Sequence, residues 1–322
     1  MPTDTAPRPQ SLMLTFLGDQ VLGRGVCVYS GSVIEVFSRA GVGEQATRST
    51  LTRMVNRDLL RRQREGRRMY FGLTERSEAI LRDGERRMWK TGAVNRDWDG
   101  TWSLLGFSLP ESWQRQRHDL RSQLTWAGFG PLFSGLWVAP GEVDVSGIVA
   151  ELGLAAHVKV FRARADTGMD IAEMIHDTWD LAELAERYRE FDARWRPLAA
   201  GGEVGGGPGV ETGGTTGTEP VTDADGLTGA EPGADAEALA GAEPASGAEE
   251  AVTDEDPLAL RLRLATEWLR VIRGDPRLPV QHLPGDWPAG AAEETFRALN
   301  ARLDAPARDV ARRVIETVPA AL

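Results

Sequence analysis

Basic and polar residues with the spacing of a helix lie in the N-terminal third of the sequence. Apolar residues recur every four positions at Leu51, Val55 and Leu59. This spacing predicts a helix from Glu44 to about Leu60 with one buried side. The opposite side would carry two guanidinium groups, two hydroxyls and an amide, from Arg48, Ser49, Thr52, Arg53 and Asn56. Guanidinium groups suit phosphate oxygens and the edge of guanine, and an amide suits adenine, so the pattern predicts a helix that contacts double-stranded DNA.

A hairpin rich in arginine is expected directly after this helix. Met69, Phe71 and Leu73 alternate with polar or small residues, which predicts a strand with one buried face. Gly66 can form the turn before it, because glycine accepts a positive φ. The segment carries five arginines opposed in the sequence only by Glu65, namely Arg61, Arg62, Arg64, Arg67 and Arg68. Such a density suits a polyanion, whereas the alternative is a solvated face. Tyr70 either touches the sugar-phosphate backbone or packs as a half-buried strand residue.

The first 92 residues as a whole are predicted to form a winged helix-turn-helix domain. Two helices are expected before the DNA-contacting one, the first ending near Gly23 and the second from Ser32 to Ala40. After the hairpin, Thr74 is expected to cap a fourth helix. Three helices, a basic hairpin and a further helix follow one another in the order of a winged helix.

The net charge of −11 is unevenly distributed along the sequence. Residues 1–92 carry sixteen Lys and Arg against ten Asp and Glu. Residues 199–256 carry fourteen acidic residues, fourteen glycines and neither Lys nor Arg. A segment of that composition buries too little apolar area to offset the entropy of ordering, so we expect an acidic, glycine-rich, disordered linker.

The remaining sequence predicts an α+β protein. Residues 93–170 have the pattern of a small α+β sandwich, and residues 171–198 and 257–322 that of a helical C-terminal domain. The individual elements expected are strands at Trp102–Phe107, Gly135–Val138 and Val158–Arg164, and helices at Pro110–Trp126 and Ile171–Trp195.

Composition excludes several classes of protein. Cys27 is the only cysteine and there are four histidines, which argues against a disulfide framework or a thiolate-rich zinc site. We therefore expect no cofactor and no metal. No run approaches the roughly 20 apolar residues of a membrane span. The first ten residues lack the pattern of a signal peptide, so a cytoplasmic location is expected.

The sequence resembles the PaaX family, which are repressors of phenylacetate-degradation operons. The resemblance covers nearly the whole chain apart from residues 199–256, which are not part of the family pattern. The segments that carry it are Ser11–Gly18, Arg48–Met54, Gly66–Thr74, Phe107–Glu111, Trp126–Gly130, Gly135–Val138, Asp275–Pro279 and Leu283–Pro288.

The resemblance implies a ferredoxin-like, Cas2-like fold for residues 93–170 between the winged helix and the helical C-terminal domain. It also implies a homodimer that binds palindromic operator DNA and is released by an aryl-CoA or acyl-CoA thioester. The phosphates of such an effector need cations. Two clusters can supply them, Arg115, Arg117 and Arg121 on the middle helix, and Arg270, Arg273 and Arg277 near the C-terminal motif. The sequence does not choose between these clusters.

Two other functions are weighed against DNA binding. A metal-dependent nuclease of the Cas2-like type needs a carboxylate at the end of the first middle strand, where Ser108 stands instead. Asp97 and Asp99 precede that strand and more readily flank a turn. The second alternative is a non-enzymatic interaction protein that docks partners through its acidic linker.

Single aromatic and histidine residues are expected to be structural rather than catalytic. We expect Trp102, Trp126 and Trp137 to pack in the core, and the same interpretation is favoured for Trp268 and Trp287 over lining an effector pocket. The remaining candidates are expected at the surface or in packing, namely His118, His157 and His176.

Overall fold

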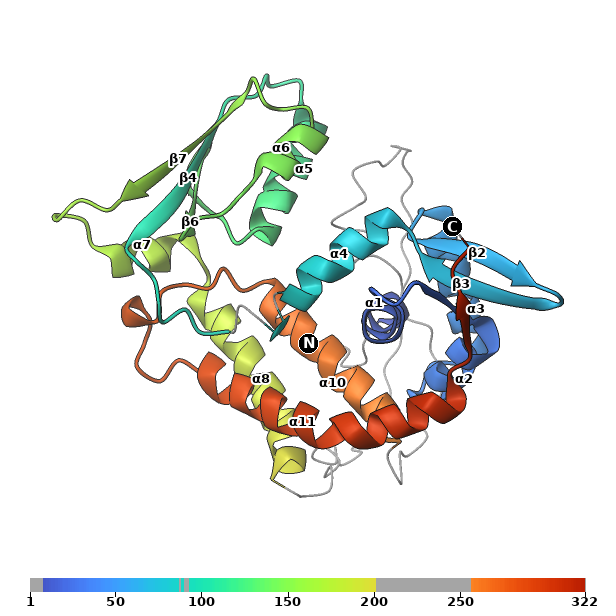
Figure 1. Ribbon diagram of the computed structural model, residues 1–322. Coiled ribbons are helices and arrows are strands. Elements are labelled where there is room, and N and C mark those ends of the chain that lie inside the picture. The colour runs from blue at the N-terminus through green and yellow to red at the C-terminus, as the bar shows by residue number, and fades with distance from the viewer. Residues whose placement is uncertain (1–7, 87, 90–92, 201–255, 322) are drawn as a thin grey trace, which may run out of the picture.

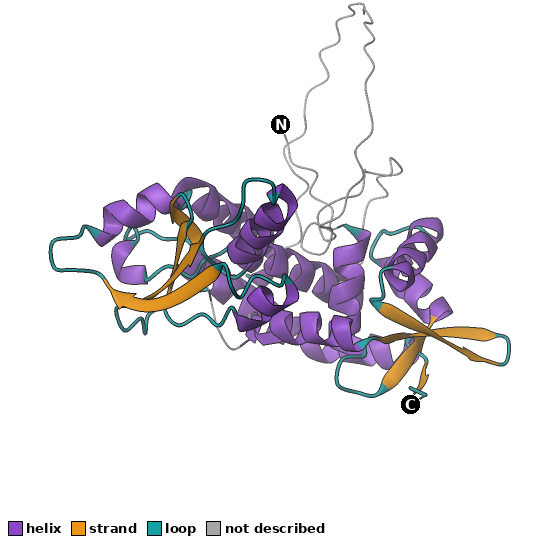
Figure 2. Cartoon of the chain, turned by 90° about the horizontal axis from the view of Figure 1, so that it is seen from above, coloured by secondary structure: helices purple, strands orange, loops and turns teal. Residues whose placement is uncertain are grey.

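The computed structural model describes residues 8–86, 88–89, 93–200 and 256–321. Two antiparallel four-stranded sheets lie at opposite ends of the molecule, with helices between them (Figures 1 and 2). The α+β class predicted from the sequence is confirmed. Within the described residues, no helix is long and apolar enough to cross a membrane.

The N-terminal region combines helices with the first sheet, whose strand order is β2-β3-β1-β8. Its elements are α1 Pro9–Gln20, β1 Val26–Tyr29, α2 Ser30–Arg39, α3 Glu44–Asn56, β2 Leu60–Glu65, β3 Arg68–Leu73 and α4 Glu75–Arg86. The expected cap of α4 is present, because the N–H of Ser77 donates to Oγ1 of Thr74 at 3.2 Å. Gly66 has a φ of 58° in the turn of the β2–β3 hairpin, as expected.

Strand β1 in this region was not expected, and two local predictions are wrong. The third helix ends at Asn56 rather than Leu60, because Asp58 adopts a φ of 55° and turns the chain into β2. The predicted one-sided strand is buried on both faces over its second half, since Tyr70 and Phe71 are 3% and 6% exposed.

The chain returns to the N-terminal sheet at its C-terminal end. Residues Thr317–Pro319 form β8, which pairs antiparallel with β1 and places Val318 opposite Cys27. The C-terminal region is therefore not entirely helical, contrary to expectation. It also shares a core with the N-terminal helices, because Leu258 and Leu262 of one C-terminal helix pack in the same cluster as Phe16 and Phe37.

The middle region contains the second sheet, with strand order β5-β6-β4-β7. Its elements are β4 Thr101–Phe107, α5 Gln114–Trp126, β5 Gly130–Phe133, β6 Leu136–Pro140, α6 Ser146–Glu151, β7 Val158–Arg164 and α7 Ile171–Thr178. The three predicted strands are present. Strand β5 and helix α6 were not expected, and α5 begins four residues later than predicted. Leu120 and Leu124 of α5 pack on one face of the sheet, and Met174 and Ile175 of α7 on the other.

Three long helices form a bundle between the two sheets. They are α8 Leu181–Ala199, α10 Pro257–Arg273 and α11 Ala289–Val314, with a short 3-10 helix, η2 Val280–His282, before the last. The single helix expected at Ile171–Trp195 is broken into α7 and α8, because the side chain of Asp180 accepts from the N–H of Glu183 and starts a new helix. Among the described residues Trp268 is the largest fully buried side chain, and it packs among Tyr188, Phe191 and Phe296.

Most of the predicted linker, from residue 201 to 255, lies outside the described residues. At its edges, Ala199 is the last residue of α8. Asp256 caps α10 by accepting from the N–H groups of Leu258 and Ala259 at 2.9 and 3.2 Å.

Candidate nucleic-acid interface

Helix α3 presents the polar side that the sequence predicted. Its buried side consists of Leu51 and Met54 with Thr47 and Thr50, while Val55 is only half-buried. The hydroxyls of both threonines are satisfied within the helix by donating to carbonyls four residues earlier. All five predicted contact residues are exposed, namely Arg48, Ser49, Thr52, Arg53 and Asn56.

The exposed residues of α3 are held only by weak local contacts. Arg48 forms an ion pair with Glu44 at 2.7 Å, with both side chains about 60% exposed. An exposed pair one helical turn apart contributes little, so a phosphate can replace the carboxylate at small cost. Arg53 donates to Oγ1 of Thr50 at 3.2 Å, and Thr52 donates to the carbonyl of Arg48 at 3.0 Å. These side chains are therefore available to a ligand.

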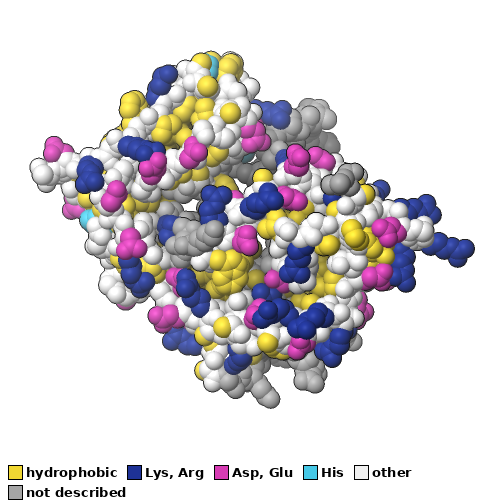
Figure 3. Space-filling view, viewed as in Figure 1, with side chains coloured by type: hydrophobic (Ala, Val, Ile, Leu, Met, Phe, Trp, Pro, Cys, Tyr) yellow, Lys and Arg dark blue, Asp and Glu magenta, His cyan; other side chains and the backbone are white. Residues whose placement is uncertain are grey.

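Strand register divides the arginines of the hairpin between two faces. Leu60, Arg62 and Arg64 alternate with Arg61 and Gln63 along β2. Because Leu60 belongs to the core beneath the helices, Arg62 and Arg64 project on the helix-facing side of the hairpin. Arg67 lies in the turn at the tip. Lys and Arg side chains gather along the projecting hairpin (Figure 3).

The face of the hairpin away from the helices is occupied by the C-terminal end of the chain. Arg68 donates to both carboxylate oxygens of Glu316 at 2.6 Å, and the hydroxyl of Tyr70 donates to the same carboxylate at 2.8 Å. Arg61 donates to the carbonyl of Ala321 at 2.7 Å. Hydrogen bonds from Tyr70 and then Arg68 lower the pKa of Glu316. Glu65 is thus not the only acidic residue opposing the hairpin arginines.

The burial of Tyr70 favours packing within the strand over contact with the sugar-phosphate backbone of DNA. Its side chain is 3% exposed, its ring lies 5.6 Å from that of Tyr29, and its hydroxyl is bonded to Glu316. The bond to Glu316 raises the pKa of Tyr70.

The two candidate effector clusters have different surroundings. In the first cluster, Arg117 donates to the carbonyl of Leu109 at 2.9 Å and so holds the loop before α5. Arg115 lies 3.8 Å from Asp119, and Arg121 is exposed on the same helix. None of these three lines the pocket described next.

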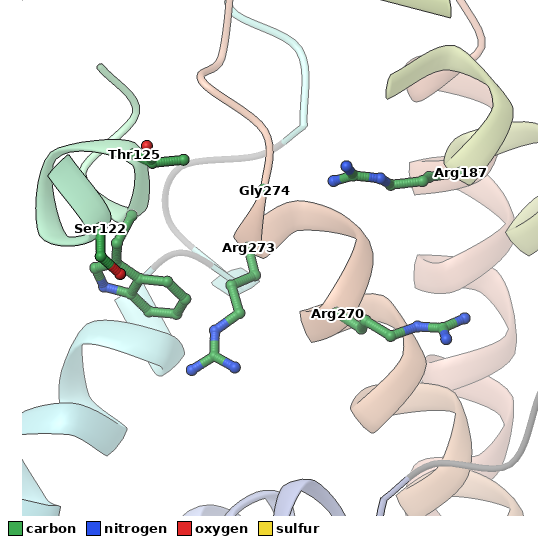
Figure 4. Close-up of a pocket in the computed structure, with 7 residues that line it drawn as sticks. Ser122, Thr125, Arg187, Arg270, Arg273 and Gly274 are labelled. Atoms are coloured by element: carbon green, nitrogen blue, oxygen red, sulfur yellow. The ribbon is translucent and has the colours of Figure 1, made fainter. Parts of the chain in front are cut away.

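Two residues of the second cluster, Arg270 and Arg273, line an open pocket of about 460 Å³ between the middle region and the bundle. The guanidinium carbon of Arg273 lies 4.0 Å from the centre of the Trp126 ring. Figure 4 shows the residues lining this pocket, which are Ser122, Thr125, Trp126, Arg187, Arg270, Arg273 and Gly274. Arg187 was missed because nothing in its local sequence distinguishes it from the other charged residues of α8. Arg277 lies outside the lining.

The predictions for the tryptophans are mostly confirmed. Trp102, Trp137 and Trp268 are buried, and Trp287 is partly buried against the bundle core. Trp126 is the exception, because it lines the pocket rather than the core.

Two of the residues considered for a nuclease, Asp99 and Ser108, have structural partners. Asp99 accepts from the N–H and hydroxyl of Thr101, and the N–H bond lowers the pKa of Asp99. Ser108 donates its N–H to the carbonyl of His157. Across the described part of the chain, no group of three or more His, Cys, Asp or Glu side chains is arranged to hold a metal ion.

Comparison with known proteins identifies the family. Three consecutive family models match, described as PaaX-like protein at residues 8–77, PaaX protein central Cas2-like domain at 95–175, and PaaX-like protein C-terminal domain at 237–313. The chain belongs to the PaaX family.

The chain is also similar to one curated protein and to one solved structure. The transcriptional repressor PaaX of Escherichia coli (strain K12) is 30% identical over 194 residues, which are 58% of this chain and 60% of that protein. The chain thus matches less than two thirds of the length of this relative. The structure of uncharacterized protein Rv0674 from Mycobacterium tuberculosis is 20% identical, with a TM-score of 0.52 over 94% of this chain and 98% of the other. That likeness concerns the fold.

Proposed function

We propose that this protein is a DNA-binding transcriptional repressor rather than an enzyme, acting in the cytoplasm. The observation that carries the proposal is the exposed polar side of α3 beside the helix-facing arginines of the β2–β3 hairpin. In this proposal residues 1–92 form a winged helix-turn-helix, with α3 in the major groove and the hairpin as the wing. The Escherichia coli relative, a transcriptional repressor, supports the same function.

The middle and C-terminal regions complete the proposed regulator. We assign residues 93–170 to a ferredoxin-like, Cas2-like scaffold and the helices of 171–198 and 257–322 to a domain for dimerisation or sensing. A homodimer would present two copies of α3 to the half-sites of a palindromic operator.

DNA binding is expected to be sequence-specific and to weaken steeply as salt rises. If the exposed arginines neutralise phosphates, bound counterions are released and the logarithm of the association constant falls linearly with the logarithm of salt concentration. The measurement is a salt titration with an operator duplex, taken from DNA upstream of the neighbouring genes, and with a scrambled duplex. Sedimentation of the complex counts the protein copies bound.

Arg53→Ala separates base recognition from phosphate contact in the same titration. Loss of a base contact should reduce discrimination between the two duplexes by about 1–3 kcal/mol, with affinity for the scrambled duplex nearly retained. Binding that shows no salt dependence, or equal affinity of the wild-type protein for both duplexes, would contradict the proposal.

An aryl-CoA or acyl-CoA thioester is proposed to release the protein from DNA by binding in the pocket between α5, α8 and α10. Arg270 and Arg273 offer cations for its phosphates and Trp126 offers an aromatic surface. The ligand releases DNA only to the extent that it binds the DNA-free state more tightly than the bound state.

The pocket is tested with phenylacetyl-CoA as the probe. The double variant Arg270→Ala and Arg273→Ala should bind operator DNA normally but lose most of its response to the thioester. The matched control, Arg115→Ala with Arg121→Ala, removes the same charge from α5 and should respond as the wild type does. If the control variant loses the response instead, the effector binds at the first cluster. If the thioester binds by calorimetry without changing operator affinity, the sensing role is wrong.

A further inference from the structure

The last residues of the chain are fastened to the arginine hairpin by several independent contacts. Strand β8 pairs with β1, and the carbonyl of Glu316 accepts from the N–H of Tyr29 at 2.9 Å. Gln63 on β2 donates to the carbonyl of Pro319 at 2.9 Å and accepts from the N–H of Ala321 at 2.8 Å. The bonds from Arg61, Arg68 and Tyr70 described above add to these contacts. The C-terminal segment therefore contacts both strands of the hairpin.

The contacts from β2 reach the C-terminal segment across two intervening strands, and the side chain of Arg61 passes over a glycine. Neither Arg61 nor Gln63 is adjacent to β8, because β3 and β1 lie between them in the sheet. Gly72 on β3 is paired with Arg61, and a Cβ there would lie 2.5 Å from Sγ of Cys27 and 3.2 Å from Nε of Arg61. The missing side chain leaves room for Arg61 to lie across the sheet. Glycine weakens a strand interior, so its presence here is explained by this close approach.

The same segment continues directly from the longest helix of the bundle. Helix α11 ends at Val314, Ile315 packs partly against the N-terminal core, and Glu316 already contacts the hairpin. With so short a connection, a displacement of the end of α11 must move β8 or break its pairing with β1.

We propose that the C-terminal segment, residues 316–321, is a strap by which the helical bundle sets the position of the arginine hairpin, with Glu316 as its main positioning residue. The strap bonds to Arg61 and Arg68, which strand register places on the face away from α3, whereas Arg62 and Arg64 lie on the helix-facing side. Toward the tip, beyond the pairing of Tyr70 with β1, the hairpin is only two strands wide, and a two-stranded ribbon is only marginally stable by itself. The strap therefore orders the hairpin before any ligand binds, which removes part of the ordering cost of binding. The part of this inference that concerns DNA rests on the proposed function.

The strap is tested first without DNA, by hydrogen exchange of the full protein measured by mass spectrometry. Deleting residues 316–322 should accelerate exchange of amides in residues 60–73 by about tenfold, while those of α10 and α11 keep their wild-type protection. Glu316→Gln removes the charge but keeps the size of the side chain, and should give a smaller acceleration in the same peptides. Unchanged exchange in residues 60–73 of both variants would overturn the proposal.

A reversible disulfide between β1 and β8 makes the opposite change, because it holds the C-terminal segment more firmly than in the wild-type protein. Val318→Cys places a thiol opposite Cys27 in a hydrogen-bonded strand pair, where the roughly 5.5 Å Cα separation suits a disulfide. Oxidation should slow exchange in the hairpin below the wild-type rate, and reduction should restore the wild-type rate. If the oxidised and reduced forms exchange alike, the segment does not govern the hairpin.

Measurements of DNA binding then distinguish a failure of the strap proposal from a failure of the proposed function. If wild-type protein binds operator DNA, the strap deletion should weaken binding to operator and scrambled duplexes by the same factor, because α3 is unchanged. If wild-type protein does not bind DNA, the proposed function fails while the exchange results still decide the strap. If the deletion reduces base discrimination as well, the segment acts on α3 and the assignment to the hairpin is wrong.

Discussion

Replacing Arg62, Arg64 and Arg67 together by alanine is expected to lower the affinity for every duplex by about a hundredfold near 0.1 M salt. These three arginines lie on the helix-facing side or at the tip of the hairpin, away from Glu316. If each neutralises one phosphate, the slope of the salt titration should fall in magnitude by about three. Because phosphate contacts carry no sequence information, the ratio of operator to scrambled affinity should stay nearly constant.

A matched variant tests whether the position of the charge matters or only its amount. Arg189 and Arg196 on α8 and Arg297 on α11 are exposed, and their replacement by alanine makes the same change in net charge. That control should leave the slope nearly unchanged, because charges beyond the Debye length of about 10 Å are screened. If it weakens binding as much as the hairpin variant does, DNA does not contact the hairpin specifically.

The pair Arg61 and Arg68 makes a sharper comparison. Both belong to the same hairpin but are bonded to Ala321 and Glu316 on its other face. Their replacement by alanine should change the slope less, per arginine removed, than replacement of the helix-facing arginines. Equal slopes per arginine would show that the C-terminal segment releases them when DNA binds.

The elements that sequence predicted well are those governed by local pattern. The polar side of α3 follows from a helical period of 3.6 residues, so the exposure of Arg48 and Arg53 could be predicted from spacing alone. The cap at Thr74 and the turn at Gly66 depend on side-chain and backbone chemistry within three or four residues.

The features that sequence missed depend on residues far apart in the chain. Arg68 and Glu316 are separated by 248 positions, and no local pattern connects them. Strand β8 is three residues long and follows a helix, so alternation over so few positions carries no signal. The residues that line the pocket were not all predicted for the same reason, since Arg187 and Trp126 meet only through packing of different helices.

Trp268→Ala is expected to give the largest loss of stability among single substitutions in the bundle, about 3–5 kcal/mol in the free energy of unfolding. The side chain is 1% exposed, stacks on Phe296 with ring centres 4.9 Å apart, and contacts Tyr188 and Phe191. It therefore joins α8, α10 and α11, and alanine would leave a cavity where the three helices meet. The loss is large against the roughly 5–15 kcal/mol of a typical domain and should appear as a lower urea midpoint.

Trp268→Phe and Trp287→Ala are the controls that assign this loss to packing. Phenylalanine keeps most ring contacts and removes an indole N–H that has no hydrogen-bond partner among the described residues, so its cost should be only about 1–2 kcal/mol. Trp287 lies at the edge of the same cluster and is partly exposed, so alanine there should cost less than about 1 kcal/mol. A wild-type urea midpoint for Trp268→Ala, combined with lost binding of phenylacetyl-CoA, would assign Trp268 to an effector pocket and contradict the packing interpretation.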